Sequence, residues 1–288
     1  MRKKKVLSLL SACLLAGALF TGCGGDDTPK PAENPQPADI KIGMIAGLNA
    51  SEQQLTEIMK KIEADAGLQL MSHNFVYYDS LNAMQMGLES KAVDEMSTYA
   101  VVSKYLMARK PDLTIVNDHK QQMPMVDNFC CAVKSDRTDL LNELNTALEA
   151  MQQDGTLETL TKQYITELKD DEEPAAVEMP MFEDADTFKV AVTGDIPPLD
   201  LIKVDGTPAG FNTAVLAEIS NRINKNFELV SIESAARASA LSSGTVDVVF
   251  WVRVPNNDDM FPDNYDRPNG IDATVPYFKD EIVHVGRK

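Results

Sequence analysis

Trp251 and Arg253 stand two residues apart in the short run Phe250-Trp251-Val252-Arg253. Side chains at positions i and i+2 of an extended strand point to the same face, so we expect the indole and the guanidinium to be neighbours. An indole face packs against flat or apolar groups, and a guanidinium forms bidentate pairs with carboxylates. The pair therefore predicts half of a binding site for a small carboxylate. Two alternatives stay open: Trp251 fills the core, or Arg253 pairs with one of the many acidic residues nearby.

Residue patterns that are typical of enzymes are absent from the sequence. His73, His119 and His284 are far apart and lack the spacing of a metal site such as HExxH. There is no GxSxG elbow, Walker loop or GxGxxG turn. Asp94 and Asp247 could suggest a carboxylate pair, but both follow a valine in the same spaced pattern, which favours two structural turns. We expect no cofactor, no metal ion and no catalytic residue.

The N-terminus has the three zones of a secretory signal peptide, predicted over residues 1–22. Four basic residues at positions 2–5 precede a mostly apolar run at 6–20, which is shorter than the roughly 20 residues of a transmembrane helix. The segment Phe20-Thr-Gly-Cys23 resembles a bacterial lipobox, with Phe20 where leucine is usual. We therefore expect cleavage before Cys23 and a lipid on its sulfur. The alternative is an ordinary signal peptide that is cut nearby.

Residues 23–38 are rich in glycine, proline and acidic side chains, a composition that stays extended in water. They predict a tether between the lipidated cysteine and a folded body. The implied location is the cell envelope, on the extracytoplasmic face of a membrane.

Charge and cysteine content limit the partners and the chemistry. The chain has 44 acidic and 27 basic residues, and four of the basic ones lie in the predicted signal peptide. This negative balance disfavours nucleic acid and anionic lipid as partners, because both need a basic surface. Beyond Cys23 only the adjacent Cys130 and Cys131 remain, and we expect them to be buried free thiols rather than a disulfide.

An acidic, proline-containing segment at residues 169–187 lacks helical or strand periodicity and is interpreted as a linker. The segments on either side, 39–168 and 188–288, alternate strand and helix patterns, which indicates an α/β fold. The predicted strands are 40–45, 75–78, 188–192 and 227–232, and the predicted helices are 51–64, 139–151 and 214–222.

One pattern occurs in both halves. Leu88–Asp94 and Leu241–Asp247 place leucine, serine, valine and aspartate at equal spacing. In each copy a predicted helix ends at the leucine and a strand begins at Val-Asp. The repetition suggests two lobes that are built from similar units.

Further motifs of the second half resemble the first lobe of a known family. They are a Pro-Pro turn at Asp195–Leu199, the pair Gly210-Phe211 before a helix, the Leu241–Asp247 turn and the strand Pro276–Val283. Residues 40–168 are similar to the second lobe and closing helices of the same family. The family is the bacterial extracellular solute-binding proteins of family 3, of the periplasmic amino-acid-binding type.

The resemblance implies a type II periplasmic-binding-protein-like fold, in which two α/β lobes close on a small-molecule ligand and deliver it to an ABC permease. The order second lobe, linker, first lobe implies a circular permutation. We expect a lipid-anchored, non-enzymatic protein of an ABC importer that binds a small polar solute, of which an amino acid is one candidate. Two alternatives stay open: a sensory or scaffolding lipoprotein with a degenerate cleft, and an enzyme on the same fold such as a dehydratase.

The residues that clamp an amino acid in this family do not match here. The position of the family's carboxylate-binding arginine falls on Asp259, that of its ammonium-binding aspartate on Tyr99, and that of its covering aromatic on Ile196. The resemblance therefore implies a cleft with different ligand contacts. The expected ligand-binding residues are Trp251, Arg253, Arg237, Asp195, Tyr99, Asn49 and Ser51.

Each of the additional residues also has a structural alternative. Arg237 lies in a segment that approaches the cleft in the family, or it is a solvated helix residue. Asn49 and Ser51 lie where the second lobe presents a helix N-terminus, which suits a carboxylate, although Ser51 alone would serve as an N-cap. Asp195 either reaches the ligand or serves the Pro-Pro turn. Tyr99 either closes over a ligand or packs.

Overall fold

A computed structural model of the chain describes residues 40–49, 52–66, 73–116, 125–256 and 265–288. The chain divides into two compact units, Met1–Gln36 and Pro37–Lys288, and all described residues belong to the second. The following predicted features lie outside the described residues: the signal peptide, Cys23, the tether, Ser51 and Asp259.

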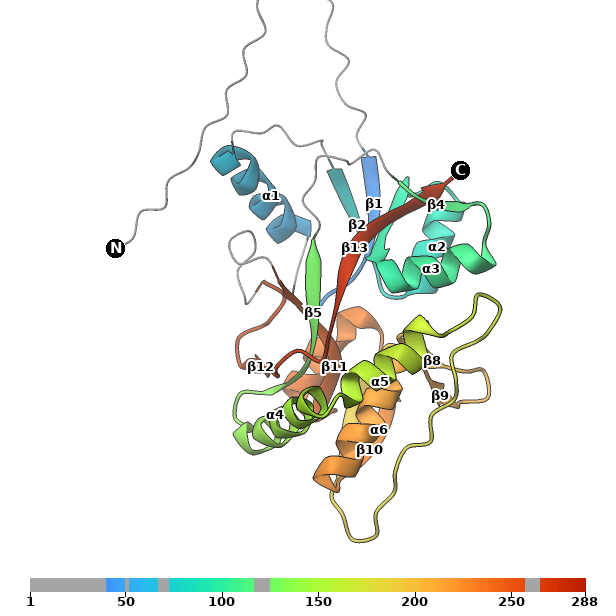
Figure 1. Cartoon of the computed structure of the whole chain (residues 1–288). Helices are drawn as coiled ribbons and strands as arrows, with labels where there is room; N and C mark the ends of the chain where they lie inside the picture. The colour runs from blue at the N-terminus through green and yellow to red at the C-terminus, as the bar shows by residue number, and fades with distance from the viewer. Residues whose placement is uncertain (1–39, 50–51, 67–72, 117–124, 257–264) are drawn as a thin grey trace, which may run out of the picture. The chain divides into compact units, whose positions relative to one another are not determined.

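Ten strands form one sheet in the described part of the chain (Figure 1), in the order β10-β6-β11-β5-β13-β3-β1-β2, with β12 beside β5 and β4 beside β13. A smaller sheet has the order β7-β8-β9. The strands are β1 (Ile40–Ile45), β2 (His73–Tyr78), β3 (Glu95–Tyr99), β4 (Leu113–Ile115), β5 (Val126–Lys134), β6 (Thr187–Val192), β7 (Asp195–Ile196), β8 (Asp200–Ile202), β9 (Pro208–Ala209), β10 (Asn226–Ser231), β11 (Val248–Pro255), β12 (Ile271–Ala273) and β13 (Phe278–Arg287).

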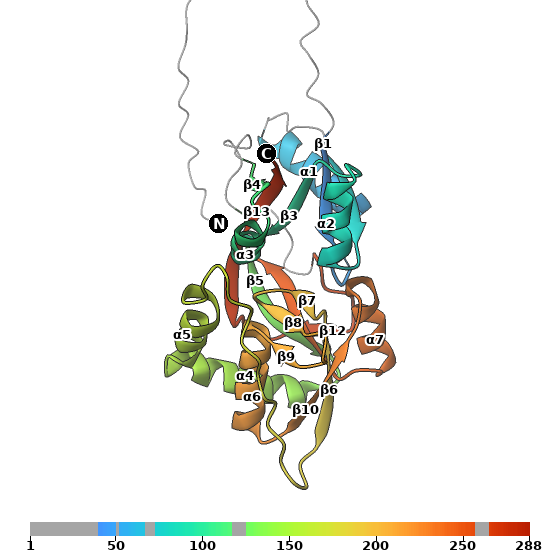
Figure 2. The same cartoon turned by 90° about the vertical axis from the view of Figure 1, so that its right-hand side faces the viewer.

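The strands and helices of this unit are grouped in two lobes. We call β1 to β4 with their helices the α1–α3 lobe, and β5 to β12 with theirs the α4–α7 lobe. The helices are α1 (Glu52–Ala66), α2 (Leu81–Glu89), α3 (Ala100–Arg109), α4 (Thr138–Gln153), α5 (Thr156–Thr161), α6 (Phe211–Ile223) and α7 (Arg237–Ser243). Figure 2 shows α5 and α7 on opposite sides of the strands of the α4–α7 lobe. This layering of helices on a sheet confirms the α/β fold that the sequence predicts.

The long strand β13 connects the lobes. Each lobe contains three parallel strands side by side, β2-β1-β3 in one lobe and β10-β6-β11 in the other, and β5 adds antiparallel to β11. Strand β13 runs antiparallel to β5 over Phe278–Glu281 and then to β3 over Ile282–Val285. The start of β13 therefore belongs to one lobe and its end to the other, as Figure 1 shows.

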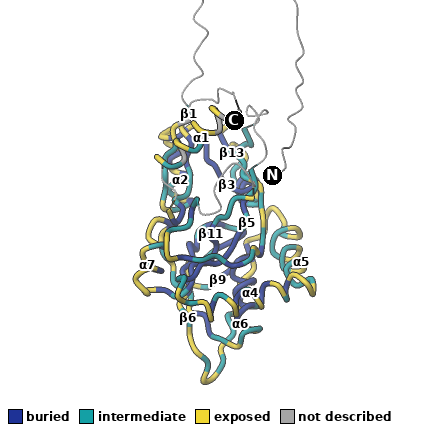
Figure 3. Tube along the Cα trace, turned by 90° about the vertical axis from the view of Figure 1, so that its left-hand side faces the viewer, coloured by how far each residue is buried: buried dark blue, intermediate teal, exposed yellow. Residues whose placement is uncertain are grey.

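Apolar periodicity explains why these elements form and which faces they bury. The apolar pattern of Leu140, Leu141, Leu144, Leu148 and Met151 predicts one buried face of α4, and all of these residues are buried except Leu141, which is partly buried. Strand β11 is buried along its first five residues, and the buried part of the trace follows β11 and β5 (Figure 3). The predicted strands and helices all occur, with ends that shift by at most three residues.

The repeated Val-Asp pattern forms the same turn in both lobes. The carboxylate of Asp94 accepts a hydrogen bond from the backbone N–H of Lys41 at 2.9 Å, and Asp247 accepts one from Lys189 at 2.9 Å. Each aspartate also donates its own N–H to the carbonyl of the same lysine, at 2.8 Å in both cases. Asp94 and Asp247 are therefore structural turn residues that fix the start of a central strand in each lobe.

Cys130 and Cys131 are buried free thiols in β5, as predicted. Burial raises the pKa of Cys130 to about 12, so its thiol stays protonated and inert near neutral pH. None of the helices within the described ranges combines the length and the apolar character that crossing a bilayer requires.

Candidate binding cleft

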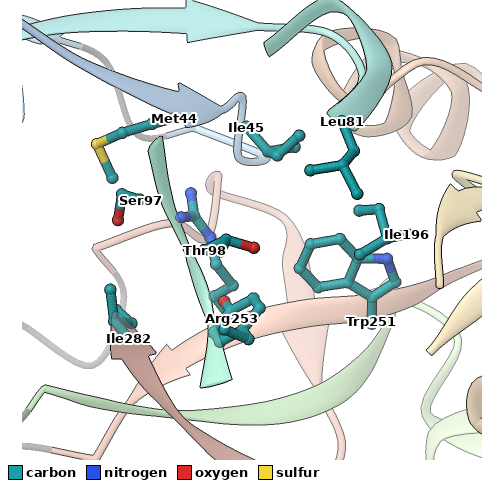
Figure 4. Close-up of a pocket in the computed structure, with 10 residues that line it drawn as sticks. Met44, Ile45, Leu81, Ser97, Thr98, Ile196, Trp251, Arg253 and Ile282 are labelled. Carbon is teal, nitrogen blue, oxygen red and sulfur yellow. The ribbon is translucent and has the colours of Figure 1, made fainter. Parts of the chain in front are cut away.

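A pocket lies where the two lobes meet, and both lobes contribute to its wall. The α1–α3 lobe supplies β1, β3 and the start of α2, and the α4–α7 lobe supplies β7 and β11. The lining residues are Met44, Ile45, Leu81, Ser97, Thr98, Tyr99, Ile196, Trp251, Arg253 and Ile282. Figure 4 shows Trp251 and Arg253 extending from β11 toward residues of the other lobe. The lining is mainly apolar, with the guanidinium as its charged group.

The cavity volume is about 30 Å³, close to the volume that one water molecule takes in the liquid. A solute of several heavy atoms does not fit in that space. A larger solute therefore needs the lobes to separate at this pocket.

Trp251 reaches the pocket because β11 bulges at this point. The register of β11 against β5 shifts between Val249 and Val252, and the backbone φ of Trp251 is +47°. A positive φ is rare for a bulky residue and marks local strain, which is common at binding sites. The bulge breaks the regular alternation on which the shared face of Trp251 and Arg253 was predicted, but both side chains still line the same pocket.

The indole of Trp251 combines the two roles that the sequence left open. It lines the pocket, yet its residue is only 4% exposed. Its ring lies 5.7 Å from that of Phe129 and 6.1 Å from that of Tyr99, and its Nε1 donates to Oγ1 of Thr193 at 3.3 Å. One edge of the indole is thus held by the core while the rest faces the cleft.

Arg237 holds the bulge and does not line the pocket. Its Nη1 donates to the carbonyl oxygens of Trp251 at 2.9 Å and Phe250 at 3.3 Å. Its guanidinium carbon lies 5.0 Å from the centre of the Trp251 ring, a cation–π distance. Burial lowers the pKa of Arg237 to about 10, which leaves it cationic near neutral pH. The structure thus places Arg237 behind the predicted site rather than in it.

Arg253 pairs with an aspartate that was not among the predicted site residues. Its Nε lies 3.6 Å from Oδ2 of Asp266, whose side chain is only 2% exposed. Oδ1 of Asp266 accepts a hydrogen bond from the backbone N–H of Asn49 at 2.9 Å. Burial lowers the pKa of Arg253, but Asp266 together with Tyr99, Asp127 and Tyr265 outweighs it and raises the pKa above its usual range. This is the alternative in which Arg253 pairs with a nearby acid.

Tyr99 lines the pocket and also packs. Its hydroxyl donates to Oδ2 of Asp127 at 2.9 Å, and its ring meets the edge of Phe129 at 4.6 Å. Burial raises the pKa of both Tyr99 and Asp127. Tyr99 therefore stays protonated, and its hydroxyl is already used within the protein.

Asp195 connects the lobes at a second point. Its Oδ2 accepts a hydrogen bond at 2.7 Å from the backbone N–H of Leu81, the first residue of α2. Unpaired amides at a helix N-terminus favour such an anion. Burial is the main cause that raises the pKa of Asp195 to about 6, against the lowering effect of the amides of Leu81 and Asn82. Asp195 does not line the pocket.

Of the predicted site residues, the structure brings Trp251, Arg253 and Tyr99 together at the pocket. Asn49 contributes a backbone amide, and Arg237 and Asp195 act behind or beside the pocket. Sequence reasoning missed Asp266, which lies in the stretch 255–270 that matches no motif. Asn49, whose amide donates a hydrogen bond to it, is 217 positions away, so no local sequence pattern indicates the role of Asp266. In the described part of the chain no cluster of three or more histidine, cysteine or acidic residues could hold a metal ion.

The chain is similar to a known protein family and to several solved structures. The family profile of the bacterial extracellular solute-binding proteins, family 3, matches residues 55–167 and 188–288. The zinc-bound ligand-binding component of an ABC-type import system from Staphylococcus aureus is 11% identical, with a TM-score of 0.42 over 86% of this chain and 65% of that one. The GluR0 ligand-binding core with L-glutamate is 12% identical, with a TM-score of 0.37 over 87% of this chain and 85% of that one.

The periplasmic aliphatic sulphonate binding protein SsuA from Escherichia coli is 12% identical, with a TM-score of 0.36 over 88% of this chain and 62% of that one. This chain thus spans less than two thirds of the Staphylococcus aureus and Escherichia coli proteins. No curated protein sequence is significantly similar to this chain.

Proposed function

The chain belongs to the bacterial extracellular solute-binding proteins of family 3 and has their type II periplasmic-binding-protein-like fold, and on this premise we propose that it captures a small carboxylate-bearing solute between its two lobes. The observation that carries the proposal is the pocket shared by the lobes, in which the guanidinium of Arg253 stands beside the indole of Trp251. A cation and an aromatic face suit a solute with a carboxylate at one end and an apolar body.

The wider setting belongs to the same proposal. The protein is anchored to a membrane through a lipid on Cys23, and residues 24–38 tether it there. The closed lobes present the solute to an ABC permease. The lobes follow the chain in permuted order, and the pairing of both β1 and β13 with β3 supports this, because it places the two ends of the described chain in one sheet.

Catalysis is not part of the proposal. Asp266 pairs with Arg253 and accepts a hydrogen bond from a backbone amide. Asp127 accepts one from Tyr99, and Asp195 accepts one from Leu81. A general acid or base needs access to a substrate proton, and these carboxylates are engaged within the protein.

A thermal-shift screen of the compact unit, residues 37–288, tests the proposal. The panel contains amino acids, short peptides, polyamines and organic acids. A solute at about 100 times its dissociation constant adds roughly 2.7 kcal/mol to the free energy of unfolding, which raises the melting temperature of a domain of this size by about 5–10 °C. We expect a carboxylate among the hits, and we expect Arg253→Ala to abolish its shift. Arg222→Ala, which removes a cation that pairs with Glu218 on α6, is the control and keeps the shift.

A second candidate function is a sensory or scaffolding role without solute binding. The small volume of the pocket at Trp251 and Arg253, about 30 Å³, favours it, because the protein's own side chains fill most of the space there. A screen in which no solute raises the melting temperature of the well-folded protein would favour this second function and overturn the first.

A further inference from the structure

The carboxylate of Asp266 joins the two lobes at the edge of the cleft. It comes from the α4–α7 lobe and lies between the guanidinium of Arg253 in the same lobe and the backbone N–H of Asn49 in the other. A carboxylate between an arginine and a backbone amide is the arrangement expected for a bound acidic ligand. Here the protein's own side chain supplies that carboxylate.

The pairing of Arg253 with Asp266 is incomplete. The Nε–Oδ2 distance of 3.6 Å exceeds the 2.7–2.9 Å of a strong charge-assisted hydrogen bond. The Nη2 of Arg253 is buried and has no hydrogen-bond partner among the described residues. An unsatisfied buried donor carries an energetic penalty. A free carboxylate can approach both nitrogens in the bidentate geometry that Asp266, tethered to its backbone, does not reach.

Gly47 makes room for the pair. A Cβ atom at Gly47 would overlap with Oδ1 of Asp266 and with Nη2 of Arg253. The backbone of the α1–α3 lobe therefore lies directly against the free nitrogen of Arg253. A ligand oxygen bound there would contact both lobes at once, as closure around a solute requires.

We propose that Asp266 is an internal surrogate ligand. It occupies the anion subsite formed by Arg253 and the backbone N–H of Asn49 when no solute is bound, and the carboxylate of a solute binds by displacing it. The inference rests on the proposed function for the identity of the natural solute. The subsite itself can be tested without that solute.

The test uses acetate as the probe and Asp266→Ala in residues 37–288. The substitution empties the subsite, so acetate should fill it and restore the missing contacts. We expect the apparent affinity for acetate, from the rise in melting temperature with concentration at constant ionic strength, to be at least about tenfold higher than in the wild type. Acetamide, which has a similar shape and no charge, should give no such effect. The double variant Asp266→Ala/Arg253→Ala should lose the effect.

Asp280→Ala is the matched control. Asp280 also accepts a hydrogen bond from a backbone amide, that of Val101 at 3.0 Å, and is partly buried, but no arginine pairs with it in the described residues. Acetate should not rescue it. If Asp266→Ala does not fold, Asp266→Asn replaces it, because the neutral amide keeps the shape, pairs more weakly with Arg253 and lets acetate compete.

Equal acetate responses of the wild type and the folded Asp266 variants would overturn the inference. So would a response that survives the loss of Arg253. Rescue by acetate together with a flat solute screen of the wild type would leave the inference standing and overturn the proposed function. The two failures are thus distinguishable.

Discussion

At the scale of single residues, burial decides what each charged side chain at the cleft can do. Arg237 and Arg253 lie near the same indole, but their surroundings differ. Arg237 is 2% exposed and donates to two backbone carbonyls. Arg253 lines the pocket and pairs loosely with Asp266. The first arginine is therefore committed to the backbone of β11, and the second keeps donor capacity for a ligand.

Arg237→Met should destabilise the protein and alter the environment of Trp251. Methionine fills the space but leaves the carbonyls of Phe250 and Trp251 without their donor, at a cost of about 2 kcal/mol. Urea unfolding measures the loss, and fluorescence reports on the bulge directly, because Trp251 is the only tryptophan. Arg222→Met, at a more exposed site with two ion pairs, is the control, with a smaller loss and an unchanged spectrum. A stable Arg237→Met protein with the wild-type spectrum would show that the bulge does not depend on this arginine.

Asp195 should lower the stability of the protein as the pH rises from about 4 to about 6. Its pKa is raised from 3.8 to about 6 by burial above all; Asp200 adds to the rise, and Arg237 and two backbone amides oppose it. The folded protein therefore binds more protons than the unfolded chain in this range, so the contribution of Asp195 to stability falls as the pH rises.

Asp195→Asn removes that contribution. It should match the wild type near pH 4 and be more stable at pH 7.5 by about 1–2 kcal/mol, because the amide oxygen can still accept from Leu81 without a buried charge. Urea unfolding at both pH values measures the difference. Asp205→Asn changes an exposed carboxyl whose pKa is lowered, and should not gain stability at pH 7.5. A loss of stability in Asp195→Asn at pH 7.5 would contradict the argument.

At the scale of elements, local sequence patterns explain the framework better than the site. The stripe of Leu140, Leu144 and Leu148 predicts α4, and the Val-Asp repeat predicts a matching turn in each lobe, because periodicity and turn chemistry act over a few residues. The bulge at Trp251 breaks the period of its strand, and the carbonyl of Trp251 accepts a hydrogen bond from Arg237, fourteen residues away. Asp266 acts on a residue 217 positions distant. Such contacts follow from the tertiary fold and leave no local pattern.

The start of α6 depends on Gly210. Its φ of +97° suits only glycine, and a Cβ there would lie 2.7 Å from the carbonyl oxygen of Pro198 and 2.8 Å from that of Leu199. These carbonyls accept the N–H groups of Phe211 and Asn212, the first residues of the helix, so they cannot move away freely.

Gly210→Ala should therefore lower the free energy of unfolding by about 3 kcal/mol. Gly206→Ala is the matched control, since Gly206 also has a positive φ but a Cβ there would meet no atom within 4 Å. It should cost about 1 kcal/mol. Denaturant titration of the two variants separates the backbone overlap from the dihedral strain. Equal losses in both variants would show that the close approach of Pro198 and Leu199 does not matter.

At the scale of the whole described unit, two carboxylates of the α4–α7 lobe hold backbone amides of the α1–α3 lobe. Asp195 accepts from Leu81 at 2.7 Å, and Asp266 accepts from Asn49 at 2.9 Å. Each lobe has a group of parallel strands with packed helices, and β13 passes from one lobe to the other, so we expect the lobes to separate as rigid bodies around β13. Opening then breaks both contacts together.

Amide hydrogen exchange tests this coupling. Asp266→Ala should speed exchange at Leu81, and Asp195→Ala should speed exchange at Asn49, each by about tenfold, because the loss of one contact raises the population of the open form. The amide of Ala83, which donates to Oγ of Ser80 within one lobe, should not change in either variant. A solute that binds the closed form should slow exchange at both Leu81 and Asn49. If each substitution affects only the amide that it contacts, the lobes do not open as rigid bodies, and closure proceeds by separate local movements.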